Sequence, residues 1–147
     1  MTDLPLVDLL VQTHPTKGRG VYANERLSPG LYVIHYPGAL LEGQDEISKR
    51  NQLYDSTGQG SFMVSFTFQS KKFCLDATDC PDSPSNMGRL INCSSKNFNL
   101  QPITHLIDGK PAVFFKTLTT IDKGIELLWD YNLNRTEQKD HPWYTSS

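Results

Sequence analysis

The sequence predicts a mainly β fold built from short, irregular strands. Segments rich in β-branched and aromatic residues recur along the chain and are bounded by turn residues, as in residues 31–36 directly after Pro29-Gly30. Helix signals are few, and the chain contains no internal repeat at any period. We expect strands at residues 31–36, 62–69, 72–76, 112–118 and 125–129.

The second and third of these strands are expected to pair as a hairpin. Four apolar residues alternate with Met63, Ser65, Thr67 and Gln69, which is the period of a strand with one buried face. The residues Gln69-Ser70-Lys71 are a plausible turn before the next strand. The buried face would carry Phe62, Val64, Phe66 and Phe68.

One helix is expected at residues 42–54. Acidic residues gather at its start and basic residues at its end, which suits the helix dipole, and Ile47 and Tyr54 lie a heptad apart on one face. Residues 87–92 suit a single buried turn, and residues 136–144 suit a short helix that Pro142 would end. The composition of residues 78–86 is that of a loop.

Length and charge limit the possible functions. A chain of 147 residues is expected to form one domain, and no linker divides it. With 16 acidic and 14 basic residues, the formal net charge of −2 argues against a general nucleic-acid binder but allows a cleft for a basic peptide. No apolar run approaches the roughly 20 residues of a membrane span. The N-terminal residues, with Asp3, Pro5 and Asp8, lack the pattern of a signal peptide.

The three cysteines are expected to be reduced thiols, as in a cytosolic or nuclear protein. His105 could complete a zinc site with Cys74, Cys80 and Cys93. No pair of cysteines has the close spacing of zinc ligands, so we expect no metal.

Four segments stand out from ordinary strands and turns, although each has a plain structural explanation. Lys17-Gly18-Arg19-Gly20-Val21 could be a tight turn, and the asparagine of Gly88-Arg89-Leu90-Ile91-Asn92-Cys93-Ser94 could cap a turn. Core packing explains part of Gly124-Ile125-Glu126-Leu127-Leu128-Trp129-Asp130-Tyr131-Asn132, but it does not require Tyr131. His141-Pro142-Trp143-Tyr144 could be a frayed end or could fold back over a flat ligand.

Together, these segments resemble the SET-domain protein-lysine methyltransferases. That family has a Gly-x-Gly loop, an R-x-I-N-H-S segment and a G-E-E-L-x-x-D-Y strand, and the three matching segments occur here in the same order. Within the family, the resemblance is greatest to the lysine monomethyltransferases of the histone H4 tail, through residues 16–21, 74–78, 88–92 and 141–143. The resemblance implies an N-terminal extension at 1–11, a SET domain at 12–132 and a tail at 133–147 with a short helix and no zinc.

The resemblance implies a SET-domain (β-clip) fold of small curved sheets, a few short helices and a C-terminal pseudoknot. The cofactor would be S-adenosyl-L-methionine, with S-adenosyl-L-homocysteine as product, bound on the face opposite the peptide, and a narrow channel would join the two. The partner would be a histone tail or another basic peptide that contains lysine, either free or within a nucleosome. The resemblance further implies a nuclear monomer that binds neither membranes nor specific nucleic-acid sequences.

The family's site residues carry over to positions that match its motifs. Tyr131 would be the catalytic residue, because its hydroxyl would orient a neutral lysine amine near the methyl group. Tyr36, Trp129 and Tyr131 would line the lysine channel. The cofactor would contact Lys17, Gly18, Arg19, Phe62, Asn92, Cys93 and Trp143.

Four positions depart from the family pattern. Cys93 replaces a histidine, Ile125 a glutamate and Phe62 a tyrosine, while Trp129 stands where relatives have tyrosine or phenylalanine. The large indole of Trp129 favours monomethylation, or it excludes the substrate lysine. The alternatives are therefore a SET-like module that binds a lysine peptide or cofactor without turnover, and an unrelated β-rich domain.

Overall fold

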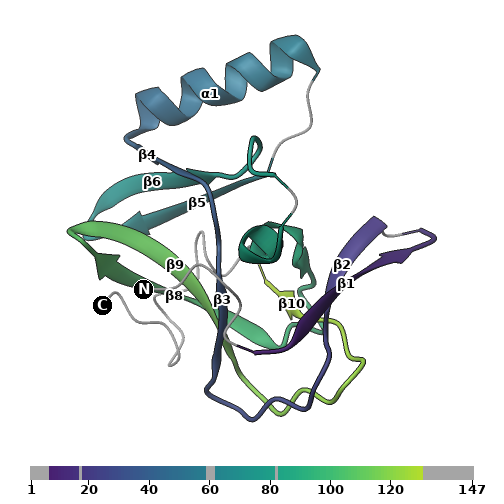
Figure 1. Ribbon diagram of the computed structural model, residues 1–147. Coiled ribbons are helices and arrows are strands. Elements are labelled where there is room, and N and C mark those ends of the chain that lie inside the picture. Colours follow the sequence, from purple (N-terminus) through teal and green to yellow (C-terminus); the bar gives the residue numbers. More distant parts are fainter. Residues whose placement is uncertain (1–6, 17, 59–61, 82, 131–147) are drawn as a thin grey trace.

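The computed structural model describes residues 7–16, 18–58, 62–81 and 83–130, which form three small sheets, one α-helix and one 3₁₀-helix (Figure 1). The predicted mainly β fold is confirmed. Strands β1 (Leu9–His14) and β2 (Gly18–Ala23) form an antiparallel pair. Because β1 includes residues on both sides of position 11, it crosses the boundary predicted between the extension and the domain.

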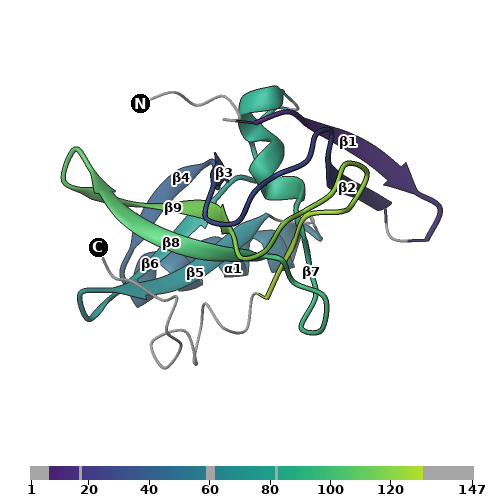
Figure 2. The same ribbon diagram turned by 90° about the horizontal axis from the view of Figure 1, so that it is seen from below.

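The largest sheet has five strands in the order β3-β9-β8-β10-β7. Its long members, β8 (Leu100–Ile107) and β9 (Lys110–Thr117), form an antiparallel hairpin whose turn lies at the opposite end of the molecule from β1 and β2 (Figure 2). On one side β9 pairs with β3 (Tyr32–His35). On the other side, the short strand β10 (Leu128–Trp129) lies between β8 and β7 (Asn92–Cys93) and is parallel to both.

The third sheet has the order β4-β6-β5 and confirms the predicted hairpin. Strands β5 (Met63–Phe68) and β6 (Lys71–Asp76) pair in register around Gln69 and Ser70, which both have positive φ angles. Strand β4 (Ala39–Glu42) pairs with β6. As the alternation predicted, one face is buried through Val64, Phe66 and Phe68.

Helix α1 (Gln44–Thr57) covers this third sheet, and Gly58 ends it in the left-handed conformation (Figure 1). The predicted burial of Ile47 and Tyr54 is confirmed, and Ile47 packs against Leu41 and Cys74 of the sheet. The predicted start was two residues early, because Glu42 belongs to β4. The chain between β6 and β7 forms the 3₁₀-helix η1 (Pro84–Leu90), which contacts both β2 and β3.

Two predictions about local structure need correction. The predicted strand at 125–129 is regular only at its end, as β10, while Glu126 makes an isolated bridge with Tyr22. The predicted loop at 78–86 includes the first turn of η1. The helix predicted at 136–144 lies outside the described residues.

One main core joins the three sheets, and its members lie on strands, on η1 and on the connections between them. Its largest fully buried side chains include Phe115, Leu27, Ile34, Leu100, Ile121 and Leu127. Among the residues that the structure describes, no helix is long and apolar enough to cross a membrane.

Candidate functional site

Three segments that the sequence singled out meet in one place. Residues 124–129 run beside β2, where Leu127 N donates to Val21 O at 2.8 Å and Ala23 N donates to Ile125 O at 3.0 Å. The same segment then continues as β10 beside β7, and Ser94 N donates to Trp129 O at 2.9 Å. The arrangement therefore places the Gly-x-Gly segment and the Asn92 segment beside consecutive parts of one short stretch of chain.

Asn92 is the side chain that joins the three segments. Its amide nitrogen donates to the carbonyl oxygen of Arg19 at 3.0 Å and to Oε2 of Glu126 at 2.8 Å. Gly20 makes this contact possible, since a Cβ at that position would lie 2.5 Å from Glu126 Oε2 and 3.1 Å from Asn92 Nδ2. The second glycine of the motif is thus required by packing between protein segments.

Two residues of this junction were missed by sequence analysis. Glu126 is an acidic residue in an otherwise apolar run, and that isolated charge was the available signal. Asn99 clamps β10, because its side chain donates to Glu126 O at 3.0 Å and accepts from Leu128 N at 2.9 Å. Its backbone N–H also donates to Leu128 O at 2.9 Å. No sequence signal distinguished Asn99 from an ordinary loop asparagine.

Two of the three residues predicted to line the channel lie around one core ring. Tyr36 and Trp129 are 6% and 3% exposed, and each makes an edge-to-face contact with Phe115, at centroid separations of 6.5 and 5.1 Å. The indole of Trp129 is therefore held firmly by the core. The third residue, Tyr131, lies outside the described residues, as do Lys17 and Trp143.

Phe62 is brought to the second motif by Arg89. The guanidinium carbon of Arg89 lies 4.6 Å from the centroid of the Phe62 ring, and Arg89 Nη1 donates to Ala77 O at 3.1 Å. Phe62 is half-buried, and Cys93 is exposed on β7. Both residues thus expose part of their surface, Phe62 beside Arg89 and Cys93 next to Asn92.

Asp76, at the end of β6, has a buried carboxylate that accepts hydrogen bonds from several groups. Its Oδ2 accepts from Tyr54 OH at 2.6 Å and from the Arg50 guanidinium, both on α1. Its Oδ1 accepts from the Thr78 hydroxyl at 2.6 Å and from Thr78 N at 3.0 Å. Burial by itself would raise the pKa of Asp76, but the hydrogen bonds from Thr78, Tyr54 and Arg50 outweigh it, so that the pKa lies below its usual value.

This lowered pKa predicts acid sensitivity. A carboxyl whose pKa is lower in the folded state stabilises the fold above the unfolded-state pKa of about 3.9, and this stabilisation is lost as the pH falls through the folded-state pKa. We expect Asp76→Asn to lower the free energy of unfolding by about 2 kcal/mol at pH 7. The difference from the wild type should shrink in urea titrations between pH 5 and pH 3. The exposed neighbour Asp79, changed to asparagine, is the control, and an equal pH slope in the two variants would contradict the role of Asp76.

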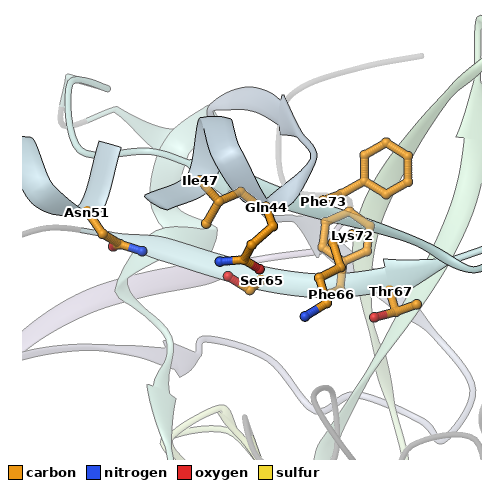
Figure 3. A pocket seen from close by; sticks show the side chains of 8 residues that line it. All are labelled: Gln44, Ile47, Asn51, Ser65, Phe66, Thr67, Lys72 and Phe73. Atoms are coloured by element: carbon orange, nitrogen blue, oxygen red, sulfur yellow. The ribbon is translucent and has the colours of Figure 1, made fainter. Parts of the chain in front are cut away.

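Two surface hollows are candidates for a binding site. One, of about 310 Å³, lies against the first motif at Arg19 and is bounded also by Val11, Pro84, Met87 and Leu90. The other, of about 350 Å³, lies between α1 and the β5–β6 hairpin, where Gln44 and Asn51 face Ser65 and Lys72 (Figure 3). Only the first contains a predicted site residue.

The cysteines and His105 do not converge in the part of the chain that the structure describes, where no three His, Cys, Asp or Glu side chains are grouped as metal ligands. Cys74 is buried, which raises the pKa of its thiol. His105 is engaged elsewhere, since its Nε2 lies 2.7 Å from the hydroxyl of Tyr32.

Comparisons with known proteins agree with this geometry. A family model described as SET domain matches residues 18–132. N-lysine methyltransferase KMT5A-A of Danio rerio is 39% identical over 137 residues, which are 92% of this chain and 38% of that protein. Histone-lysine N-methyltransferase set-1 of Caenorhabditis elegans is 33% identical over 132 residues, which are 89% of this chain and 53% of that protein.

Among solved structures, the crystal structure of CpSET8 from Cryptosporidium has a TM-score of 0.79 and 32% sequence identity. The similarity covers 86% of this chain and 58% of that chain. The chain thus spans about two fifths to one half of the curated relatives described above.

Proposed function

The chain belongs to the SET-domain family, and from this premise we propose that it is an S-adenosylmethionine-dependent protein-lysine N-methyltransferase. Its substrate is a histone tail of the H4 type, and it acts in the nucleus. The names of the similar proteins, which are N-lysine and histone-lysine methyltransferases, support the reaction type. The observation that carries the proposal is the hydrogen bonding of Asn92 to both Arg19 and Glu126, because it joins three separate motifs into one site.

The residues around this junction fit the cofactor. S-adenosylmethionine, when bound, supplies an electrophilic methyl group on a sulfonium. Arg19 is exposed and would pair with a carboxylate, while Gly18 has a φ of +79° and open space beside its Cα, so its backbone leaves room for a ligand. Asn92 and Cys93 would offer polar groups along β7, and Phe62 an aromatic surface. Lys17, next to Gly18, and Trp143 would complete this set.

The opposite side of the junction would receive the lysine. Only the neutral amine is a nucleophile, and a nearby positive sulfonium together with desolvation would favour that form. Tyr36 and Trp129 would exclude water around the side chain, and the Tyr131 hydroxyl would orient the amine. Most of what these residues contribute would then come from holding the amine in a fixed position and direction toward the cofactor.

The buried indole of Trp129 favours a single methylation. It is 3% exposed and is held against Phe115, so the ring has little freedom to move aside for a methylated amine. We expect only monomethyl-lysine from a histone H4 tail peptide, measured by mass spectrometry after many turnovers. A trimethylated product would refute this restriction.

The activity itself is tested with a radiolabelled methyl donor. Wild-type protein should transfer label to a histone H4 tail peptide or nucleosome, and it should not label the same peptide with its lysines replaced by arginine. Calorimetry with S-adenosylmethionine measures cofactor binding separately. Cofactor or peptide binding without transfer would favour a SET-like binding module, and the absence of binding would overturn the proposal.

A further inference from the structure

Phe62, which we place beside the cofactor, is held by the chain segment that follows β6. Its N–H donates to the Thr78 hydroxyl at 3.1 Å, and its carbonyl accepts from Ala77 N at 2.8 Å. Its ring lies under the guanidinium of Arg89, which also binds the Ala77 carbonyl. The backbone of Phe62 is thus fixed on both sides, and its ring is fixed by a third contact.

The orientation of the Thr78 hydroxyl is set by Asp76. An ionised carboxylate can only accept hydrogen bonds, so the single hydroxyl proton of Thr78 must point to Asp76 Oδ1, 2.6 Å away. The lone pairs of the Thr78 hydroxyl oxygen are then left to accept from Phe62 N. Because the pKa of Asp76 is lowered, the carboxylate is charged at neutral pH, which keeps this polarity fixed.

Asp76 also connects this arrangement to α1. Its other oxygen, Oδ2, accepts from Arg50 and Tyr54, which lie about one helical turn apart on α1. Tyr54, Asp76 and Thr78 therefore form a continuous chain of hydrogen bonds from the helix to the backbone of Phe62. The same helix also lines the hollow that it forms with the β5–β6 hairpin, through Gln44, Ile47 and Asn51 (Figure 3).

We propose that Asp76 and Thr78 are positioning residues that couple helix α1 to the cofactor contact at Phe62. The proposal rests on the proposed function, since it assumes that Phe62 contacts S-adenosylmethionine. In this proposal, the hydroxyl of Thr78 fixes the position of Phe62. Asp76 in turn orients that hydroxyl and is itself held by α1. The residues need not touch the reacting atoms themselves.

The first test removes the hydroxyl without changing the side-chain shape. We expect Thr78→Val to raise the dissociation constant for S-adenosylmethionine about tenfold in calorimetry and to raise the KM for the cofactor equally, with the peptide KM unchanged. Thr78→Ser, which restores the hydroxyl, should return both values to within about twofold of the wild type. Thr119→Val is the matched control, because Thr119 is exposed and its hydroxyl donates to the carbonyl of the neighbouring Thr120.

The second test measures coupling to the helix. Tyr54→Phe should raise the cofactor dissociation constant about threefold in the otherwise wild-type protein and should have no further effect in Thr78→Val, because both changes break one chain of hydrogen bonds. Amide hydrogen exchange at Phe62 should quicken at least tenfold in the folded Thr78→Val protein. Amides of the core strand β9 in the same protein report on global unfolding, so an increase at Phe62 that exceeds theirs is a local effect.

The outcomes separate this inference from the proposed function. If the wild type binds or turns over the cofactor and Thr78→Val matches it, the positioning role is overturned while the function stands. Independent, additive effects of Tyr54→Phe and Thr78→Val would overturn the coupling to α1. If the wild type binds no S-adenosylmethionine, the proposed function fails.

Discussion

Gly88→Ala should destabilise the protein by about 3 kcal/mol or more, although it adds only a single methyl group. A Cβ at this position would overlap the carbonyl oxygen of His35 and would also press on its carbonyl carbon, beside Tyr36. The backbone at His35 and Tyr36 cannot shift easily. His35 in β3 pairs with Phe114 in β9, and Tyr36 N donates to Val113 O at 2.8 Å. Urea denaturation followed by far-ultraviolet circular dichroism measures the change.

Gly109→Ala is the matched control for this substitution. Gly109 lies in the turn between β8 and β9, with open space around its Cα but a φ of +80°. Alanine there should cost only the strain of a left-handed backbone, about 1–2 kcal/mol. If Gly88→Ala were no more destabilising than Gly109→Ala, then η1 would not pack against the end of β3 as closely as described.

Tyr131→Phe should have the largest effect on activity, lowering kcat about 100-fold or more. We assign the orientation of the lysine amine to the Tyr131 hydroxyl, and the loss of one preorganised hydrogen-bonding group in a water-excluded site typically reduces turnover by that factor. Tyr131 follows shortly after β10, whose pairing with β7 and β8 fixes the chain up to Trp129. Initial rates at saturating cofactor and peptide measure kcat.

Binding and a second tyrosine distinguish catalysis from general damage. The dissociation constant of the Tyr131→Phe variant for S-adenosylmethionine should remain within about threefold of the wild-type value. Tyr32→Phe also removes one hydroxyl, which bonds to His105 on the large sheet, and should leave turnover within twofold. Undiminished turnover of Tyr131→Phe would remove the catalytic role that we assign to Tyr131.

The sequence predicted the parts of the fold in which local pattern and burial agree. The β5–β6 hairpin has strict alternation around a two-residue turn, and α1 has acidic residues early and two buried residues a heptad apart. Strands β1, β2, β4, β7 and β8 were missed, and β2 includes residues whose glycines had suggested a tight turn. In β8, Pro102 and polar residues that do not alternate with apolar ones obscured a strand that is largely buried between β9 and β10.

The candidate site shows the same division between local and long-range information. The three motifs could be recognised because their residue order is local, and the structure brings the first to the second and third through Asn92. The contacts of Gly20 and Gly88 could not be predicted, since each meets a segment that lies far away along the chain. The role of Asn99 likewise depends on its contact with Leu128 in β10, which lies 29 residues later in the sequence.

The insertion of β10 between β7 and β8 also bears on how the molecule is made. Until Leu128 and Trp129 leave the ribosome, the edges of β7 and β8 that pair with β10 have no partner strand. Asn92 likewise has to wait for Glu126, which accepts its hydrogen bond and lies only two residues before β10. Both long hairpins can form earlier from neighbouring residues. A nascent chain would therefore form most of its sheets before the three motifs meet. The candidate site would form last, when β10 inserts between β7 and β8.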